Sequence, residues 1–132
     1  DEGIMLNQDG TVSEGTGENI FLLSNGTIHT PPVADNNLTG ITRDSVYQLA
    51  TNELGLELVE RHIRRSELYL ADEIFLTGTA AHVTPVGHVD NRPIGDGDVG
   101  PITRSLRDLY ASAVRGNNSK YLHWSSAVPL EI

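Results

Sequence analysis

The chain contains no cysteine among its 132 residues. This absence excludes disulfide bonds, a zinc site built on thiolates and a cysteine nucleophile, and it is compatible with a reducing compartment. Long apolar runs are missing as well, because no uninterrupted stretch approaches the roughly 18 to 20 residues that a membrane-spanning helix needs. We therefore expect a cytoplasmic protein with no membrane-spanning segment.

Positive charge is scarce. The 9 Lys and Arg residues are outnumbered by 18 Asp and Glu residues, which gives a formal net charge of −9 and a pI near 4.8. Binding to nucleic acid or to anionic lipid depends on clustered Lys and Arg, so this balance argues against both partners. The length and a hydrophobic content of 38% suit one domain with an ordinary core.

Two further kinds of site lack the residues they need. The single lysine, Lys120, stands in a polar stretch after the last expected helix, so we interpret it as an exposed charge and not as a catalytic amine. The five histidines show no metal-ligand spacing, and Asp90, Asp96 and Asp98 lack the ligand order of a calcium loop. The sequence predicts no metal site.

Turn signals predict two β-hairpins in the first 30 residues. Asn25-Gly26 separates two β-rich runs, 19–23 and 27–30, and Asp9-Gly10 separates two shorter ones. Such pairs favour the left-handed backbone that tight hairpin turns need. Further strands are expected over 56–63, 74–77 and 83–89, the last of them bulged or at a sheet edge because Pro85 interrupts it.

Helical spacing of apolar residues predicts three helices. The clearest starts at Thr42, whose hydroxyl can cap it, and stops at Gly55. Ser66 can cap a short second helix, and Gly100-Pro101 opens a third that stops at Gly116. The order of these elements predicts an α/β fold in which helices pack on a mixed β-sheet.

Three glycine-containing loops carry residues that suit a ligand site. Residues 13–19, Ser-Glu-Gly-Thr-Gly-Glu-Asn, combine carboxylates with glycines that let a ligand approach the backbone. Gly40-Ile41-Thr42 opens a helix, where unpaired amide groups and the helix dipole favour an anion. Gly78-Thr79-Ala80-Ala81 follows a buried strand, where α/β proteins usually bind ligands. Taken singly, the three loops also fit a turn, a helix cap and a tight corner.

Taken in order, these loops resemble the class IV aminotransferases and, among them, the branched-chain aminotransferases. The series comprises Ser-Glu-Gly-Thr-Gly-Glu-Asn (13–19), Thr-Pro-Pro (30–32), Gly-Ile-Thr-Arg-Asp-Ser (40–45), Gly-Thr-Ala-Ala (78–81) and Gly-Pro-Ile-Thr (100–103). The resemblance implies that 1–132 is the C-terminal, cofactor-binding domain of a pyridoxal phosphate enzyme, with a mixed sheet that closes toward a pseudo-barrel. It also implies that an N-terminal domain and the catalytic lysine lie upstream of this chain.

The resemblance assigns cofactor contacts to six residues, of which Thr79 also belongs to the substrate side. Glu14 would bind the pyridine nitrogen, where a carboxylate favours the protonated ring, and Leu38 would pack against that ring. Gly40 and the amide groups of Ile41 and Thr42, with the Thr42 hydroxyl, would hold the cofactor phosphate. This assignment agrees with the helix-start interpretation reached from the residues alone.

The substrate side and the reaction are also implied by the resemblance. Thr79 would reach the phosphate too, and the amide groups of Thr79 and Ala80 would receive the substrate carboxylate. The implied reaction moves the amino group of leucine, isoleucine or valine to 2-oxoglutarate, which yields 2-oxo acids and glutamate, in a homo-oligomeric protein. Without the upstream lysine as general base, we expect this chain alone to be inactive.

Two positions depart from the family pattern, and two alternatives stay open. His82 stands where Glu is usual and Thr39 where Pro is usual, and His82 could alter the charge near the substrate carboxylate. Related class IV enzymes, the D-amino-acid aminotransferases and the aminodeoxychorismate lyases, share the Glu and phosphate loops but lack the run at 78–85, Gly-Thr-Ala-Ala-x-Val-Thr-Pro. The other alternative is a non-catalytic domain that binds phosphate compounds or packs against a partner.

Overall fold

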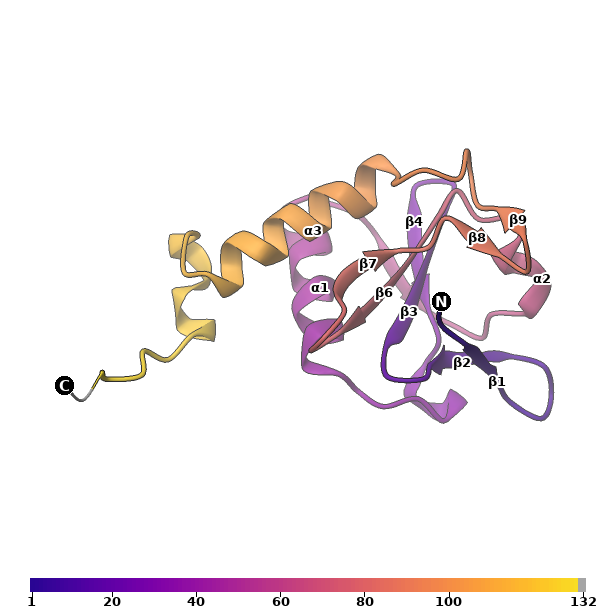
Figure 1. The fold of residues 1–132 in the computed structure, drawn as a ribbon, viewed down its shortest axis with the longest axis horizontal. Coiled ribbons are helices and arrows are strands. Elements are labelled where there is room, and N and C mark those ends of the chain that lie inside the picture. The colour runs from indigo at the N-terminus through magenta and orange to yellow at the C-terminus, as the bar shows by residue number, and fades with distance from the viewer. Residues whose placement is uncertain (131–132) are drawn as a thin grey trace.

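The structure, a computed structural model, describes residues 1–130 and has a mixed β-sheet at its centre (Figure 1). Five strands form this sheet in the order β5-β4-β3-β6-β7. Their bounds are β3 Asn19–Ser24, β4 Thr27–Thr30, β5 Leu58–Glu60, β6 Glu73–Gly78 and β7 His82–Pro85. Neighbouring strands are antiparallel except β4 and β5, which are parallel. The predicted mixed sheet is confirmed.

Two small ladders and the helices surround the central sheet (Figure 1). β1 Ile4–Leu6 pairs with β2 Val12–Gly15, and β8 His88–Val89 pairs with β9 Arg92–Pro93. The helices are α1 Ile41–Asn52, α2 Arg65–Leu68 and α3 Pro101–Val114, with 3₁₀ helices at Val33–Asp35 and Ser119–Trp124. Within residues 1–130, none of the helices has the length and apolar character needed to cross a membrane.

The core lies on both faces of the two central strands, β3 and β6. Phe21 and Phe75 stand opposite each other in the ladder and stack with their ring centroids 5.0 Å apart. They belong to the apolar cluster that α1 and α3 cover. The alternate residues point into a second cluster, which includes Ile20, Leu22, Ile74 and Leu76. Because side chains alternate along a strand, continuous apolar runs are what strands covered on both faces require.

The hairpin and helix-stop predictions are confirmed. Asn25 and Gly26 join β3 to β4 with φ values of 51° and 78°, and Gly10 has a φ of 84° in the first hairpin. Gly55 and Gly116, with φ values of 62° and 71°, follow α1 and α3. Left-handed backbone at these positions turns the chain back, and it is the conformation that glycine and asparagine tolerate best.

Both predictions of capping side chains are wrong. Gly40 is the N-cap of α1, and Thr42 lies inside the first turn, where its side chain makes no capping bond. Ser66 lies inside α2, and the carboxylate of Glu67 instead accepts a hydrogen bond from the Arg64 N–H at 2.9 Å. A charged acceptor forms a stronger bond to a backbone amide than a hydroxyl does.

Two predicted strands are shorter than expected. The 83–89 segment divides at Pro85, where β7 ends as an outer strand of the sheet, and β8 forms a separate ladder with β9. Proline has no amide hydrogen to continue a ladder, so a strand that contains Pro85 is expected at the edge of a sheet. The predicted edge position is confirmed for β7. The 56–63 segment contributes only β5, and Ile63 beyond it turns into the core.

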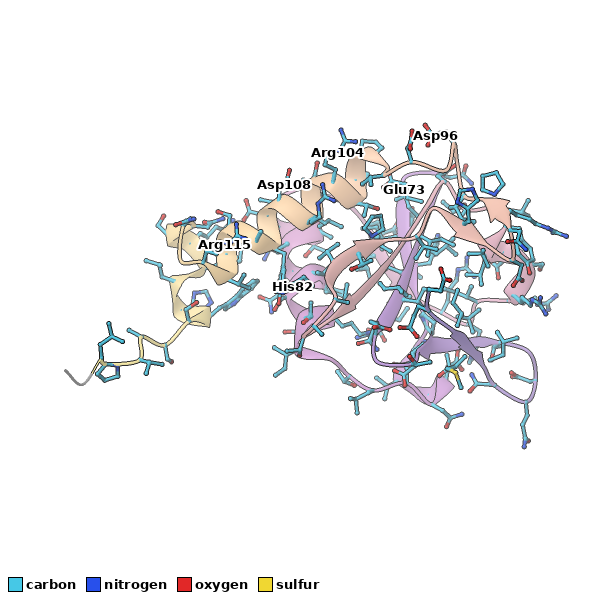
Figure 2. The ribbon with its side chains drawn as sticks, viewed as in Figure 1. Glu73, His82, Asp96, Arg104, Asp108 and Arg115 are labelled. Carbon is cyan, nitrogen blue, oxygen red and sulfur yellow. The ribbon has the colours of Figure 1, made fainter. Side chains whose placement is uncertain are left out.

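A buried carboxylate ties α3 to the central sheet. Glu73 opens β6 and is 7% exposed. Its oxygens accept hydrogen bonds from the Ile102 N–H at 3.1 Å, the Thr103 N–H at 2.7 Å and the Thr103 hydroxyl at 2.7 Å. These first-turn amides have no partner within α3 and carry the positive end of its dipole. Figure 2 shows Glu73 below the start of α3, so a strand residue caps the helix.

We expect Glu73→Ala to lower the free energy of unfolding by about 2–4 kcal/mol, because buried amide groups of α3 lose a charged acceptor. Chemical denaturation measures the change. Glu57→Ala removes an exposed carboxylate and serves as the control, with an expected change below about 0.5 kcal/mol. Equal losses in the two variants would show that Glu73 does not hold α3.

Candidate ligand site at the ends of the central strands

Two of the three glycine-containing loops meet where β3 begins and β6 ends. Asn19, the first residue of β3, is paired with Thr77 in the ladder, and Gly78 follows directly. The loop before β3 and the corner after β6 therefore lie at the same edge of the sheet. Their contact is tight, since a Cβ atom on Gly78 would lie 3.0 Å from the carbonyl oxygen of Gly17.

Asn19 connects the third loop to this edge. Its side chain is buried, and its Nδ2 donates to the carbonyl oxygen of Leu38 at 2.6 Å. A Cβ atom on Gly40 would lie only 2.5 Å from Asn19 Oδ1, so the absent side chain of Gly40 permits the approach. Asn19 belongs to the 13–19 motif, and the resemblance assigns it no contact with the cofactor. The signal in the sequence is a single polar residue, Asn19, at the start of an otherwise apolar run, 20–23.

Glu14 and Leu38, which come from different segments of the chain, lie together. The Glu14 carboxylate accepts a hydrogen bond from the Leu38 N–H at 2.9 Å and has further acceptor positions. The side chains of Leu38 and Ile41 are 76% and 86% exposed. This combination of exposed apolar side chains and a carboxylate suits a ligand that has an apolar body and a polar group.

The start of α1 offers unpaired backbone donors. Among residues 1–130 no side chain caps the helix, and the first bond to its N-cap runs from the Asp44 N–H to the Gly40 carbonyl at 3.1 Å. The amide groups of Ile41 and Thr42 precede that bond, at the positive end of the dipole. Thr42 is 4% exposed, and its hydroxyl oxygen lies 3.5 Å from the Tyr110 hydroxyl of α3. These donors fit a bound anion.

The corner after β6 borders the same region. Thr79 and Ala80 are exposed. His82 opens β7 with a φ of 55°, and its ring lies edge-on to the Tyr110 ring, with centroids 5.9 Å apart. Figure 2 shows His82 on the side of the sheet that α1 and α3 cover. Tyr110 therefore contacts both the corner and the start of α1.

A carboxylate near the chain start is linked to the loop before β3. The Thr16 hydroxyl and the Gly3 N–H donate to Glu2. These two hydrogen bonds lower the pKa of the Glu2 carboxyl. The negative charge of Glu2 is therefore held beside the loop that carries Glu14.

Lys120 lies away from the site. It donates to Glu53 at 2.5 Å, just beyond the last residue of α1, and this hydrogen bond raises the pKa of the lysine. The 12 residues of α1 span roughly 18 Å, so the ammonium group is at the opposite end of the helix from Gly40. Across residues 1–130, no group of three or more His, Asp or Glu side chains is placed to hold a metal ion.

The fold and the geometry of the three loops define the class of protein. The family model for amino-transferase class IV matches residues 1–89, a segment that contains all three loops. The chain belongs to the class IV aminotransferases.

Its relatives are branched-chain aminotransferases. The chain is 48% identical to the branched-chain-amino-acid aminotransferase of Pseudomonas aeruginosa over 97% of its length, and 42% identical to that of Escherichia coli strain K12 over 96%. It spans 41% of each of these relatives.

The solved structures that resemble this chain are also branched-chain aminotransferases. The chain is similar to the T.th. branched-chain amino acid aminotransferase with pyridoxamine 5'-phosphate, with a TM-score of 0.94 and 46% identity, over 98% of this chain and 42% of that one. It is also similar to the PLP form of the Thermobaculum terrenum enzyme, with a TM-score of 0.91 and 45% identity, over 94% of this chain and 40% of that one. The predicted fold class and family are confirmed.

We expect Gly40→Ala to lower the free energy of unfolding by about 1–3 kcal/mol, because the new methyl group would displace the buried Asn19 side chain. The backbone φ of Gly40 is −77°, so the effect would come from this contact and not from strain. Gly17→Ala is the matched control, since a Cβ atom there meets nothing within 4 Å. Chemical denaturation of both variants measures the difference, and equal stabilities would contradict the close approach.

Proposed function

We propose that this chain forms the cofactor-binding part of a branched-chain amino-acid aminotransferase that uses pyridoxal phosphate. One observation carries the proposal: Glu14, the exposed Leu38 and the uncapped start of α1 lie side by side. This arrangement offers a carboxylate, an apolar surface and anion donors to one ligand. Pyridoxal phosphate needs these three features for its ring nitrogen, its ring face and its phosphate.

The start of α1 would hold the phosphate. The amide groups of Ile41 and Thr42 and the Thr42 hydroxyl are donors, and the helix dipole favours a dianion at this position. Gly40, which has no side chain, lets the buried Asn19 amide lie against this helix start. Thr79 would add a hydroxyl from the corner after β6, and the amide groups of Thr79 and Ala80 would receive the substrate carboxylate.

Glu14 and Leu38 would hold the ring. The Glu14 carboxylate would keep a proton on the pyridine nitrogen, and the Leu38 N–H, 2.9 Å from a Glu14 oxygen, orients that carboxylate. The Leu38 side chain would cover one face of the ring. When bound, the cofactor supplies an electron-withdrawing ring that stabilises negative charge on the α-carbon of the substrate.

The proposed substrates are branched-chain amino acids and 2-oxoglutarate. The T.th. enzyme has been solved with 4-methylvaleric acid, whose carbon skeleton is that of leucine. It has also been solved with N-(5'-phosphopyridoxyl)-L-glutamate, a compound that joins the cofactor to glutamate. These two ligands support an enzyme that accepts both an apolar and an acidic amino acid at one site.

The general base is proposed to come from outside these 132 residues. Lys120 is the only lysine of the chain, and it is protonated and bound to Glu53 beyond the far end of α1. A transaminase needs an amine at the reacting carbon to move protons. The relatives are more than twice as long as this chain, which leaves room for such a residue. A homo-oligomeric assembly and a cytoplasmic location stay predictions.

We expect Glu14→Gln in the full-length protein to lower kcat at least about a hundredfold, because an amide cannot keep the ring nitrogen protonated. The glutamine oxygen can still accept the Leu38 N–H, so the loop should keep its shape. Steady-state kinetics with leucine and 2-oxoglutarate measure the loss. Glu18→Gln alters the other carboxylate of the same loop and is the control. A kcat of Glu14→Gln equal to that of the control would rule out this role.

We expect the 132-residue chain by itself to catalyse no transamination, because it contains no lysine at the site. The full-length protein, assayed beside it with leucine and 2-oxoglutarate, provides the reference rate. Glutamate formation by the isolated chain above the rate of free pyridoxal phosphate would overturn the proposed location of the general base.

A further inference from the structure

The hydroxyl of Thr42 differs from the other serine and threonine hydroxyls of α1. Ser45 and Thr51 donate to the carbonyl four residues earlier, each at 3.0 Å, which is the usual arrangement in a helix. For Thr42 the residue four positions earlier is Leu38, which lies outside the helix. The Leu38 carbonyl is already bonded to Asn19 at 2.6 Å. The Thr42 hydroxyl therefore makes no hydrogen bond to the carbonyl four residues earlier and is available to another partner.

Its neighbour is Tyr110. The two hydroxyl oxygens are 3.5 Å apart, and within residues 1–130 neither side chain has another hydrogen-bond partner. Tyr110 is half-buried on α3, with its ring edge-on to His82. The Glu73 cap fixes the helix that carries it. Three elements, α1, α3 and β7, therefore bring one tyrosine hydroxyl to the start of α1.

We propose that Tyr110 is a positioning residue that donates its hydroxyl hydrogen to Thr42 Oγ1, so that the Thr42 hydrogen points to the phosphate bound at the start of α1. The proposal rests on the proposed function. A threonine hydroxyl has one hydrogen and two acceptor positions, whereas phosphate oxygens facing donors act as acceptors. Tyr110 as the donor and phosphate as the acceptor satisfy Thr42 from both sides, while His82 restrains the tyrosine ring.

The contact is expected to shorten when the anion binds. A separation of 3.5 Å is longer than the roughly 2.5–3.0 Å of a normal O–H···O bond. Hydrogen bonds of a site are often long before the ligand is present and tighten with it. In a chain of donors each bond polarises the next, so a charged acceptor at Thr42 strengthens the bond from Tyr110.

The test compares Tyr110→Phe with Tyr47→Phe in the full-length protein. Tyr47 lies on α1 at 36% exposure, so both variants lose one phenolic oxygen. The dissociation constants of pyridoxal phosphate and of pyridoxal, which lacks the phosphate, are measured by absorbance titration of the apoprotein. We expect Tyr110→Phe to weaken pyridoxal phosphate about three- to tenfold and to leave pyridoxal unchanged. Tyr47→Phe should change neither constant.

A second measurement separates positioning from packing. In a Thr42→Val background, Tyr110→Phe should change the dissociation constant of pyridoxal phosphate by less than about twofold, because the two hydroxyls act together. The ³¹P resonance of the bound cofactor should shift in Tyr110→Phe and not in Tyr47→Phe. Should Thr42→Val not fold, the titrations and the resonance decide.

The outcomes separate this inference from the proposed function. Equal affinities of wild type and Tyr110→Phe for pyridoxal phosphate would overturn the role of Tyr110 and leave the proposed function intact. An equal weakening of pyridoxal and pyridoxal phosphate would assign Tyr110 to packing and overturn the role too. Failure of the wild type to bind pyridoxal phosphate would refute the proposed function itself.

Discussion

The carboxylate of Glu73 at the start of α3 is the interaction on which the arrangement of the helices depends. Burial of a charge is unfavourable unless donors surround it, and Glu73 receives three hydrogen bonds from Ile102 and Thr103. The same bonds satisfy amide groups that a helix leaves unpaired. Since α3 packs on β7 and α1, the helix that Glu73 anchors also brings Tyr110 to Thr42 and His82.

The site lies where the central strands end because backbone groups there are free of the ladder. Inside β3 and β6 the backbone is paired with neighbouring strands and the side chains are buried, so the sheet interior offers nothing to a ligand. At its edge three loops come close through glycines, with Gly40 against Asn19 and Gly78 against Gly17. This close approach brings carboxylate, amide and hydroxyl groups together, which is the combination that the proposed cofactor would use.

Much of the fold could be predicted because its signals are local. Asn25-Gly26 adopts a left-handed turn for reasons internal to those residues, and the alternation around Phe21 and Phe75 reflects two covered faces. The cap prediction at Thr42 was wrong because Gly40 is the N-cap and the Thr42 hydroxyl lies beside Tyr110 of α3. The cap prediction at Ser66 was wrong because the Glu67 carboxylate, a stronger acceptor, binds the Arg64 N–H. The candidate loops are recognisable by their order in the chain. Tyr110, which reaches the start of α1 from α3, has no local signature, and Asn19 is marked only as a polar residue at the start of an apolar strand.

The sequence by itself determined the turns, the strand and helix segments, the acidic balance and the family, since each depends on neighbouring residues or on motifs read in order. Tertiary structure alone decided which groups meet. Glu73 and Thr103 are 30 residues apart, and Thr42 and Tyr110 are 68 residues apart. Contacts over such separations exist only after the sheet has assembled and both helices have packed on it, because no local preference specifies the distance between two atoms on different elements.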